Sequence, residues 1–192
     1  MSEADLPIDR EIVRKTIIGL SLLLAFSGLC GWLFKEPIVA IGQAFLDRFG
    51  LAGLFIGTII ADTSPLPLTH EPLSFIAIAA GLPSWKIIGV ISAGSVASGP
   101  TGWVLGRVLL SQGRFAHWLE RRQPRLMRFM RRRGLATVAV AALLPLPFAL
   151  ATWMAGMLRL PLGKITAISL LRIVKVGFYF QLMKLGWLAG GG

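Results

Sequence analysis

Two apolar stretches of the chain are each interrupted by a Pro-Leu-Pro tripeptide. These interruptions limit the possible folds more than any other feature of the sequence. The prolines are Pro65 and Pro67 in the first copy and Pro145 and Pro147 in the second. The flanking apolar runs hold ten to thirteen residues and cover residues 51–61, 73–82, 134–144 and 148–160. At about 1.5 Å of rise per residue, such a run reaches about halfway across a bilayer core of about 30 Å. The sequence therefore predicts two hairpins of half-length helices, each entering and leaving the membrane on one side.

Three longer apolar runs predict helices that cross the membrane completely, at residues 17–34, 87–110 and 165–188. The first follows several basic residues, and its 18 residues favour an uncleaved span over a signal peptide. Residues 38–49 carry apolar side chains at helical spacing, which predicts a short amphipathic helix at the membrane surface. With 55% hydrophobic and 15% charged residues, the composition excludes a disordered protein, a disulfide scaffold and an ordinary soluble enzyme.

The two hairpins begin a repeat, because the same order of signals follows each one. An Ala-Gly pair, a Pro-x-x-Lys motif and a full span follow, starting at Ala80-Gly81 and at Ala155-Gly156. Residues 107–133 hold nine arginines and one acid, and the positive-inside rule places this amphipathic segment in the cytoplasm. A single crossing then separates the two copies, which makes the repeat inverted, as in many transporters. The alternative is an ordinary helix bundle that contains some prolines.

The predicted fold is an all-α polytopic membrane protein. It is an inverted repeat of two re-entrant helical hairpins, each followed by a transmembrane helix, with an N-terminal transmembrane helix and a basic amphipathic cytoplasmic segment. Residues 1–48 would form the N-terminal transmembrane and interfacial helices, and residues 49–188 the membrane domain. The basic N-terminus is expected in the cytoplasm. Small residues at every fourth position of the span 87–110 predict close helix packing: Gly94, Ser98, Gly102 and Gly106.

Four charged residues are the predicted site for substrate binding and proton coupling. Asp62 and Glu71 flank the tip of the first hairpin. A charged side chain at the bilayer centre costs about 2.5–3.5 kcal/mol on insertion scales, so it is usually functional and either paired or hydrated. Arg172 and Lys175 lie near the middle of the last span and are the expected partners of the two acids. The alternatives are a shallow, wet hairpin tip for the acids and snorkelling for the cations.

From the other chemically distinctive residues we expect neither enzymatic activity nor a bound cofactor. His70 is interpreted as a polar residue of the hairpin tip, because one histidine beside one glutamate is not a metal site. Ser64 and Ser98 have no base at a recognisable spacing, so no catalytic residue is expected. The single cysteine, Cys30, excludes an intrachain disulfide.

The charge balance of 20 Lys and Arg against 9 Asp and Glu predicts anionic membrane lipids as partners. Nucleic acid also attracts basic proteins, but the apolar runs make lipid headgroups and membrane orientation the better explanation. The sequence leaves open whether the protein forms a homo-oligomer. The arginines assigned to lipid headgroups are Arg107, Arg131, Arg132 and Arg133.

In the order of these motifs, the chain resembles the DedA family. This family comprises the bacterial members of the VTT (SNARE-associated Golgi protein) superfamily. The chain resembles especially the short YqaA-like branch. The resemblance covers residues 49–186. It rests on Pro67-x-x-x-Glu71, Ala80-Gly81, Gly102-x-x-x-Gly106-Arg107, Pro145 with Ala155-Gly156, and the basic span that holds Arg172 and Lys175. It implies two oppositely oriented re-entrant hairpins in the bacterial inner membrane. It also implies lipid transport, meaning movement of phospholipids between leaflets or recycling of polyprenyl-phosphate carriers, often linked to proton motive force.

The resemblance assigns Asp62 and Glu71 to the acidic hairpin positions that matter in other DedA proteins. Many DedA proteins also carry two arginines in the second hairpin, where this chain has Ala142 and Phe148. Phosphate binding by other cations, a different substrate, and loss of transport therefore stay open. The expected function is a membrane lipid transporter. The alternatives are a proton-linked transporter of small solutes or ions, and a membrane scaffold or assembly protein without transport.

Overall fold

The computed structural model describes residues 10–64, 70–108, 121, 124–144 and 147–190. Within these ranges the chain forms helices and no strands, which confirms the predicted all-α fold. Their bounds are α1 (Arg10–Leu33), α2 (Lys35–Thr63), α3 (Glu71–Ala79), α4 (Ser84–Val108), α6 (Pro124–Leu143), α7 (Phe148–Met157), α8 (Leu162–Ser169) and α9 (Arg172–Ala189).

Three helical stretches in the described part of the chain are long and apolar enough to cross a membrane: Lys35–Thr63, Ser84–Val108 and Leu162–Ala189. Large apolar side chains on them are exposed, including Ile60 on α2 and Val174 on α9. An extensive apolar surface of this kind is unfavourable in water and suits contact with lipid. The protein is thus a multi-pass membrane protein.

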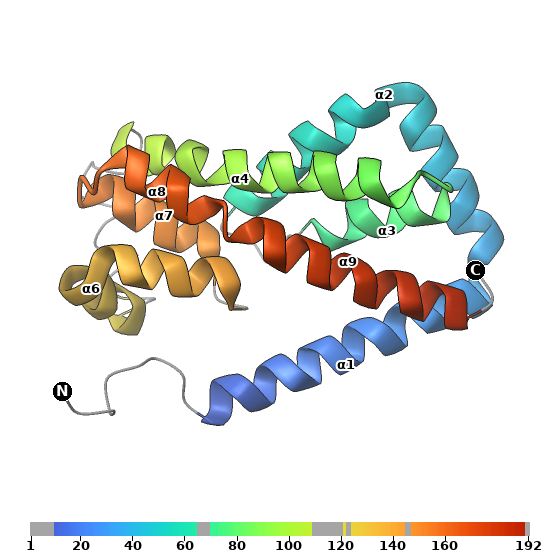
Figure 1. Cartoon of the computed structure of the whole chain (residues 1–192), viewed down its shortest axis with the longest axis horizontal. Helices are drawn as coiled ribbons and strands as arrows, with labels where there is room; N and C mark the ends of the chain where they lie inside the picture. The colour runs from blue at the N-terminus through green and yellow to red at the C-terminus, as the bar shows by residue number, and fades with distance from the viewer. Residues whose placement is uncertain (1–9, 65–69, 109–120, 122–123, 145–146, 191–192) are drawn as a thin grey trace.

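The predicted first span, residues 17–34, is not among these three stretches. Its helix α1 contributes a shorter apolar part, Ile17–Phe26, and lies along α9, where Gly28 approaches the backbone of Gly186. The sequence predicts two separate segments, residues 38–49 and 51–61, where the structure has the single element α2. Gly50 divides α2 with a φ of 56°, a conformation that favours glycine, and α2 bends there (Figure 1).

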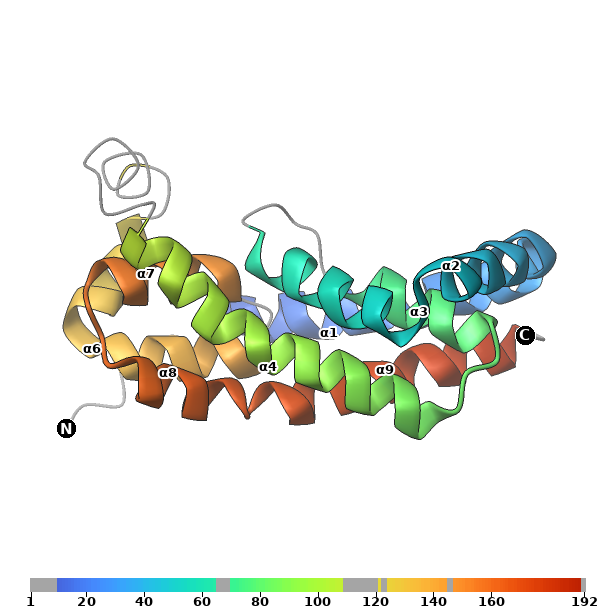
Figure 2. The ribbon, with the colours of Figure 1, turned by 90° about the horizontal axis from the view of Figure 1, so that it is seen from above.

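Two helical hairpins point in opposite directions along the molecule. The part of α2 after Gly50 pairs with α3, and the part of α6 after its non-helical residue Arg133 pairs with α7. The first hairpin opens toward one end of the long axis and the second toward the other, with both tips near the centre (Figures 1 and 2). An inverted repeat produces this arrangement.

Helix α4 lies between the hairpins and contacts both through small residues. A Cβ at Gly94 would meet the carbonyl oxygen of Phe55 on α2 at 2.8 Å. A Cβ at Gly102 or Gly106 would overlap Thr152 or the backbone of Trp153 on α7. The absence of side chains at these positions lets the helix backbones approach closely. Ser98, also buried on this helix, donates a hydrogen bond of 2.7 Å to the carbonyl of Ser95.

The predicted last span, residues 165–188, is not one continuous helix. It is divided into α8 and α9 at Leu170 and Leu171. The amides of these two residues donate to carbonyls three residues earlier, at 3.2 and 3.0 Å, which is the tighter 3₁₀ pattern. The turn puts Arg172 at the start of α9, near the centre of the molecule.

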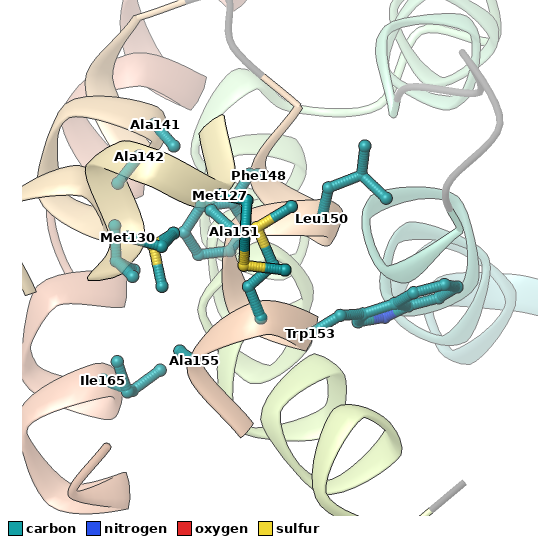
Figure 3. Packing of buried hydrophobic residues seen from close by; sticks show 12 residues of the cluster. Met127, Met130, Ala141, Ala142, Phe148, Leu150, Ala151, Trp153, Ala155 and Ile165 are labelled. Atoms are coloured by element: carbon teal, nitrogen blue, oxygen red, sulfur yellow. The ribbon is translucent and has the colours of Figure 1, made fainter. Parts of the chain in front are cut away.

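Two apolar clusters stabilise the two halves. One surrounds the second hairpin and combines side chains of α6 and α7 with Ile165 of α8 (Figure 3). The other joins the first hairpin to α4 and α9 through Leu54, Ile91 and Phe180. The polar residues described next lie between these clusters, where the hairpin tips meet.

Candidate functional site

A buried ion pair joins the first hairpin to the last span. Nη2 of Arg172 donates to Oδ2 of Asp62, and the two side chains are 3% and 4% exposed. Ser95 of α4 completes the arrangement, since its hydroxyl donates to Asp62 at 2.6 Å and accepts from Nε of Arg172 at 2.6 Å. A buried pair is stable only when such additional hydrogen bonds satisfy its remaining polar groups.

His70 binds the other oxygen of Asp62. Its Nδ1 lies 3.0 Å from Oδ1 of Asp62, so Nδ1 carries the proton of this hydrogen bond. His70 is 2% exposed, and its Nε2 has no hydrogen-bond partner among the described residues. Asp62 therefore connects residues of α2, α4 and α9 with the residue that precedes α3.

Local sequence signals put these side chains at helix ends. Ser64 precedes Pro65 and is extended, with φ −68° and ψ 138°, as the residue before a proline prefers. Helix α2 consequently ends one residue after Asp62. Helix α3 begins at Glu71 with a proline in its first turn, which suits a helix start.

The second hairpin contributes an aromatic face to the same site. The guanidinium carbon of Arg172 lies 4.2 Å from the ring centroid of Phe148, the first residue of α7. This distance is within the range of a cation–π contact. Arg172 thus contacts one residue from each hairpin tip, Asp62 by charge and Phe148 by its ring.

Glu71 and Lys175 lie beside this cluster and form no ion pair with one another in the described part of the chain. Glu71 is half-buried, and its Oε2 is buried without a hydrogen-bond partner there. Lys175 lies one turn after Arg172, within electrostatic range of Glu71 and Asp62. Its Nζ lies 5.5 Å from the ring centroid of Tyr179. Of the expected acid–cation pairs, the structure brings together Asp62 and Arg172.

The remaining predicted site residues either lie on α4, on α6 or next to α7, or fall outside the described residues. Pro147 is exposed and directly precedes α7. Three of the predicted headgroup arginines are exposed on α6, and the fourth, Arg107, has its guanidinium carbon 5.7 Å from the Trp103 ring centroid. The prolines outside the described residues are Pro65, Pro67 and Pro145.

Sequence reasoning missed Ser95 and Phe148 and gave His70 only a minor role. The repeat itself contained a signal for Ser95, because Ser95 and Arg172 each lie three residues after the serine of an Ile-Ser pair. The repeat is asymmetric in charge. When the two Pro-Leu-Pro motifs are aligned, Ala142 and Ala151 take the places of Asp62 and Glu71.

Ala142 and Ala151 are fully buried in the apolar cluster of the second hairpin (Figure 3). The acidic residues of the cluster therefore come from the first hairpin alone. Within the described residues, no group of three His, Cys, Asp or Glu side chains lies close enough together to hold a metal ion.

Comparison with known families agrees with this architecture. Residues 66–185, more than half of the chain, match the family model of the VTT domain. No curated protein and no solved structure matches the chain. The matched region includes Glu71 and Arg172 and begins after Asp62. The YqaA-like branch stays a prediction, whereas the family is established: the chain belongs to the VTT domain family (DedA/SNARE-associated) of membrane proteins.

Proposed function

We propose that this protein is a lipid transporter of the bacterial inner membrane that moves phospholipids or polyprenyl phosphates between leaflets. The observation that carries the proposal is the buried ion pair of Arg172 and Asp62 at the meeting point of two oppositely directed hairpins. Charged groups at membrane depth are costly and usually mark a transport path. Transporters built from inverted repeats bind their substrates at this position.

A lipid phosphate would compete with Asp62 for Arg172. Guanidinium groups bind phosphate and carboxylate with the same paired geometry, so the two anions are alternative partners. When phosphate takes the place of Asp62, the first hairpin loses its charged link to α9. Phe148 keeps its contact with the guanidinium, so the second hairpin stays connected to the occupied site.

Proton coupling would act through the two acids. Protonation of Asp62 or Glu71 removes a negative charge close to Arg172 and Lys175, which makes the site more attractive to phosphate. Asp62 has partners at both oxygens, whereas Glu71 has an unpartnered buried oxygen among the described residues. Glu71 is therefore the better candidate for a role in proton coupling.

The membrane orientation belongs to the same proposal. The N-terminus and the arginine-rich part of α6 would lie in the cytoplasm, and both hairpins would be re-entrant. The exposed Arg131, Arg132 and Arg133 would bind anionic headgroups of the cytoplasmic leaflet. The proposal involves transport and no covalent chemistry.

A membrane scaffold without transport is the second candidate. The observation that favours it is the hydrogen bonding of the ion pair, in which both Asp62 oxygens and two Arg172 nitrogens are bound. A satisfied pair of this kind can hold two repeats together without ever opening.

Reconstitution into liposomes that contain a fluorescent phosphatidylglycerol tests the proposal. A reductant added outside quenches only outer-leaflet lipid, so a transporter raises the quenched fraction. We expect transport by the wild type and by Lys184→Gln, a control on α9 whose amine donates a hydrogen bond to Ser84. Asp62→Asn and Arg172→Gln should lose it. Proton flux with tight lipid retention indicates a solute transporter, and neither activity indicates a scaffold.

A further inference from the structure

A groove on the first repeat lies apart from the polar cluster. It has a volume of about 480 Å³ and is formed by α2 just after the Gly50 kink and by the beginning of α4. Leu51 and Phe55 line it from α2, and Lys86, Gly89 and Val90 line it from α4. None of these residues belongs to the site around Arg172.

The groove exists because two closely packed helices separate. They cross at Gly94, where a Cβ would meet the carbonyl oxygen of Phe55 at 2.8 Å. From this crossing α2 and α4 diverge toward the Gly50 kink (Figure 1). Gly89 leaves the space between them open, since a Cβ at that position would meet nothing within 4 Å.

The lining is apolar except for one cation. Lys86 is half-buried at the start of a helix long enough to span the membrane, with its Nζ 5.4 Å from the ring centroid of Trp85. Trp85 is 72% exposed. Tryptophan and lysine at the end of a span lie at the level of lipid headgroups. No acidic side chain forms an ion pair with Lys86 in the part of the chain that the structure describes.

We propose that this groove binds one glycerophospholipid, with an acyl chain between α2 and α4 and its phosphate on Lys86. The apolar lining matches a methylene chain, and the ammonium group complements the phosphate charge. From Lys86 to Ala93 the helix rises about 10 Å, which accommodates the upper part of an acyl chain below the headgroup. The indole N–H of Trp85 supplies a further donor at headgroup level.

Native mass spectrometry of the purified full chain with phosphatidylglycerol and with diacylglycerol tests this site. Diacylglycerol has the acyl chains and lacks the phosphate. Lys86→Gln should bind phosphatidylglycerol about fivefold more weakly, as for loss of one cation near a lipid surface, and diacylglycerol equally well. Gly89→Leu fills the groove and should weaken both lipids. Gly163→Leu is the matched control, because a Cβ at that exposed helical glycine also meets nothing.

The outcomes distinguish a bound phospholipid from a second copy of the chain as the occupant of the groove. Unchanged phosphatidylglycerol binding by Lys86→Gln overturns the headgroup contact, and unchanged binding of both lipids by Gly89→Leu overturns the groove as the site. A dimer that Gly89→Leu abolishes without any effect on lipid binding assigns the groove to a second copy of the chain and also overturns the proposal. Thermal unfolding of each variant verifies that it folds. The readout is binding, so the result is independent of whether the protein transports lipid.

Discussion

Arg172 at the start of α9 forms a buried ion pair with Asp62 at the end of α2, 110 residues earlier in the chain. Ser95 of α4 bridges the two side chains, and Phe148 of α7 covers the guanidinium. One arginine thus connects the first hairpin, the central helix, the second hairpin and the last span. Any motion of the hairpins relative to one another must change the contacts of this residue.

Removal of one partner of the ion pair should strongly destabilise the fold. Arg172→Gln leaves Asp62 as a buried, uncompensated charge, and the expected loss is about 3–5 kcal/mol. The double variant Asp62→Asn with Arg172→Gln should recover a large part of this loss. Thermal unfolding in detergent measures it, with Lys184→Gln as the control. Losses that simply add in the double variant would contradict a direct pair.

Glu71→Gln should leave stability nearly unchanged and abolish coupling of transport to protons. The substitution keeps the size and hydrogen-bonding capacity of the side chain and removes its titration. Glu71 forms no ion pair among the described residues, so no paired cation is exposed by the change. Liposome transport with and without a pH gradient provides the measurement. A response of this variant to the pH gradient equal to that of the wild type would contradict the proposed role of Glu71.

His70 offers two substitutions that separate hydrogen bonding from titration. His70→Asn can keep a donor near the position of Nδ1, so the bond to Asp62 and the stability should be largely preserved. His70→Leu removes the donor and leaves Oδ1 of Asp62 without this partner. The expected cost is about 1–3 kcal/mol, measured by thermal unfolding. Equal stability of the two variants would show that the histidine contact does not support the ion pair.

Gly106→Ala should weaken the packing of α4 against α7. The added Cβ would overlap the carbonyl of Trp153, so the helices must move apart, at a cost of about 1–3 kcal/mol. Gly89→Ala is the control, since its Cβ meets nothing and alanine favours a helix over glycine by about 1 kcal/mol. Unfolding of both variants is compared with the wild type. A loss of equal size in Gly89→Ala would mean that helix packing is not the cause.

Cysteine labelling tests the membrane orientation. Helix α4 begins at one end of the molecule and α8 at the other (Figure 1). In a Cys30→Ser background, an impermeant thiol reagent should label Pro83→Cys in intact cells. The same reagent should label Gly163→Cys only after the cells are opened. Both positions are exposed in the structure. Labelling of Gly163→Cys in intact cells would contradict a cytoplasmic position for this end.

The sequence alone predicted the features that depend on local chemistry. Apolar length, proline breaks and a low charge content predict helices in a membrane, and two similar Pro-broken stretches predict two hairpins. Because burying a charge is costly, the sequence alone predicted Asp62 and Arg172 as site residues, although the distance between them was not known. A non-helical residue at Gly50 also agrees with the predicted division between residues 38–49 and 51–61.

Only the tertiary structure decided which of these residues meet. Arg172 could pair with Asp62 or Glu71 on sequence grounds, and the choice depends on where α2 ends and how α9 turns. That turn, at Leu170 and Leu171, contains no proline or glycine, so no local sequence signal predicts it. The contact with Phe148 depends on how the second hairpin lies against α9. Local signals determine helices and their ends, whereas contacts between distant segments depend on packing geometry that a linear pattern does not contain.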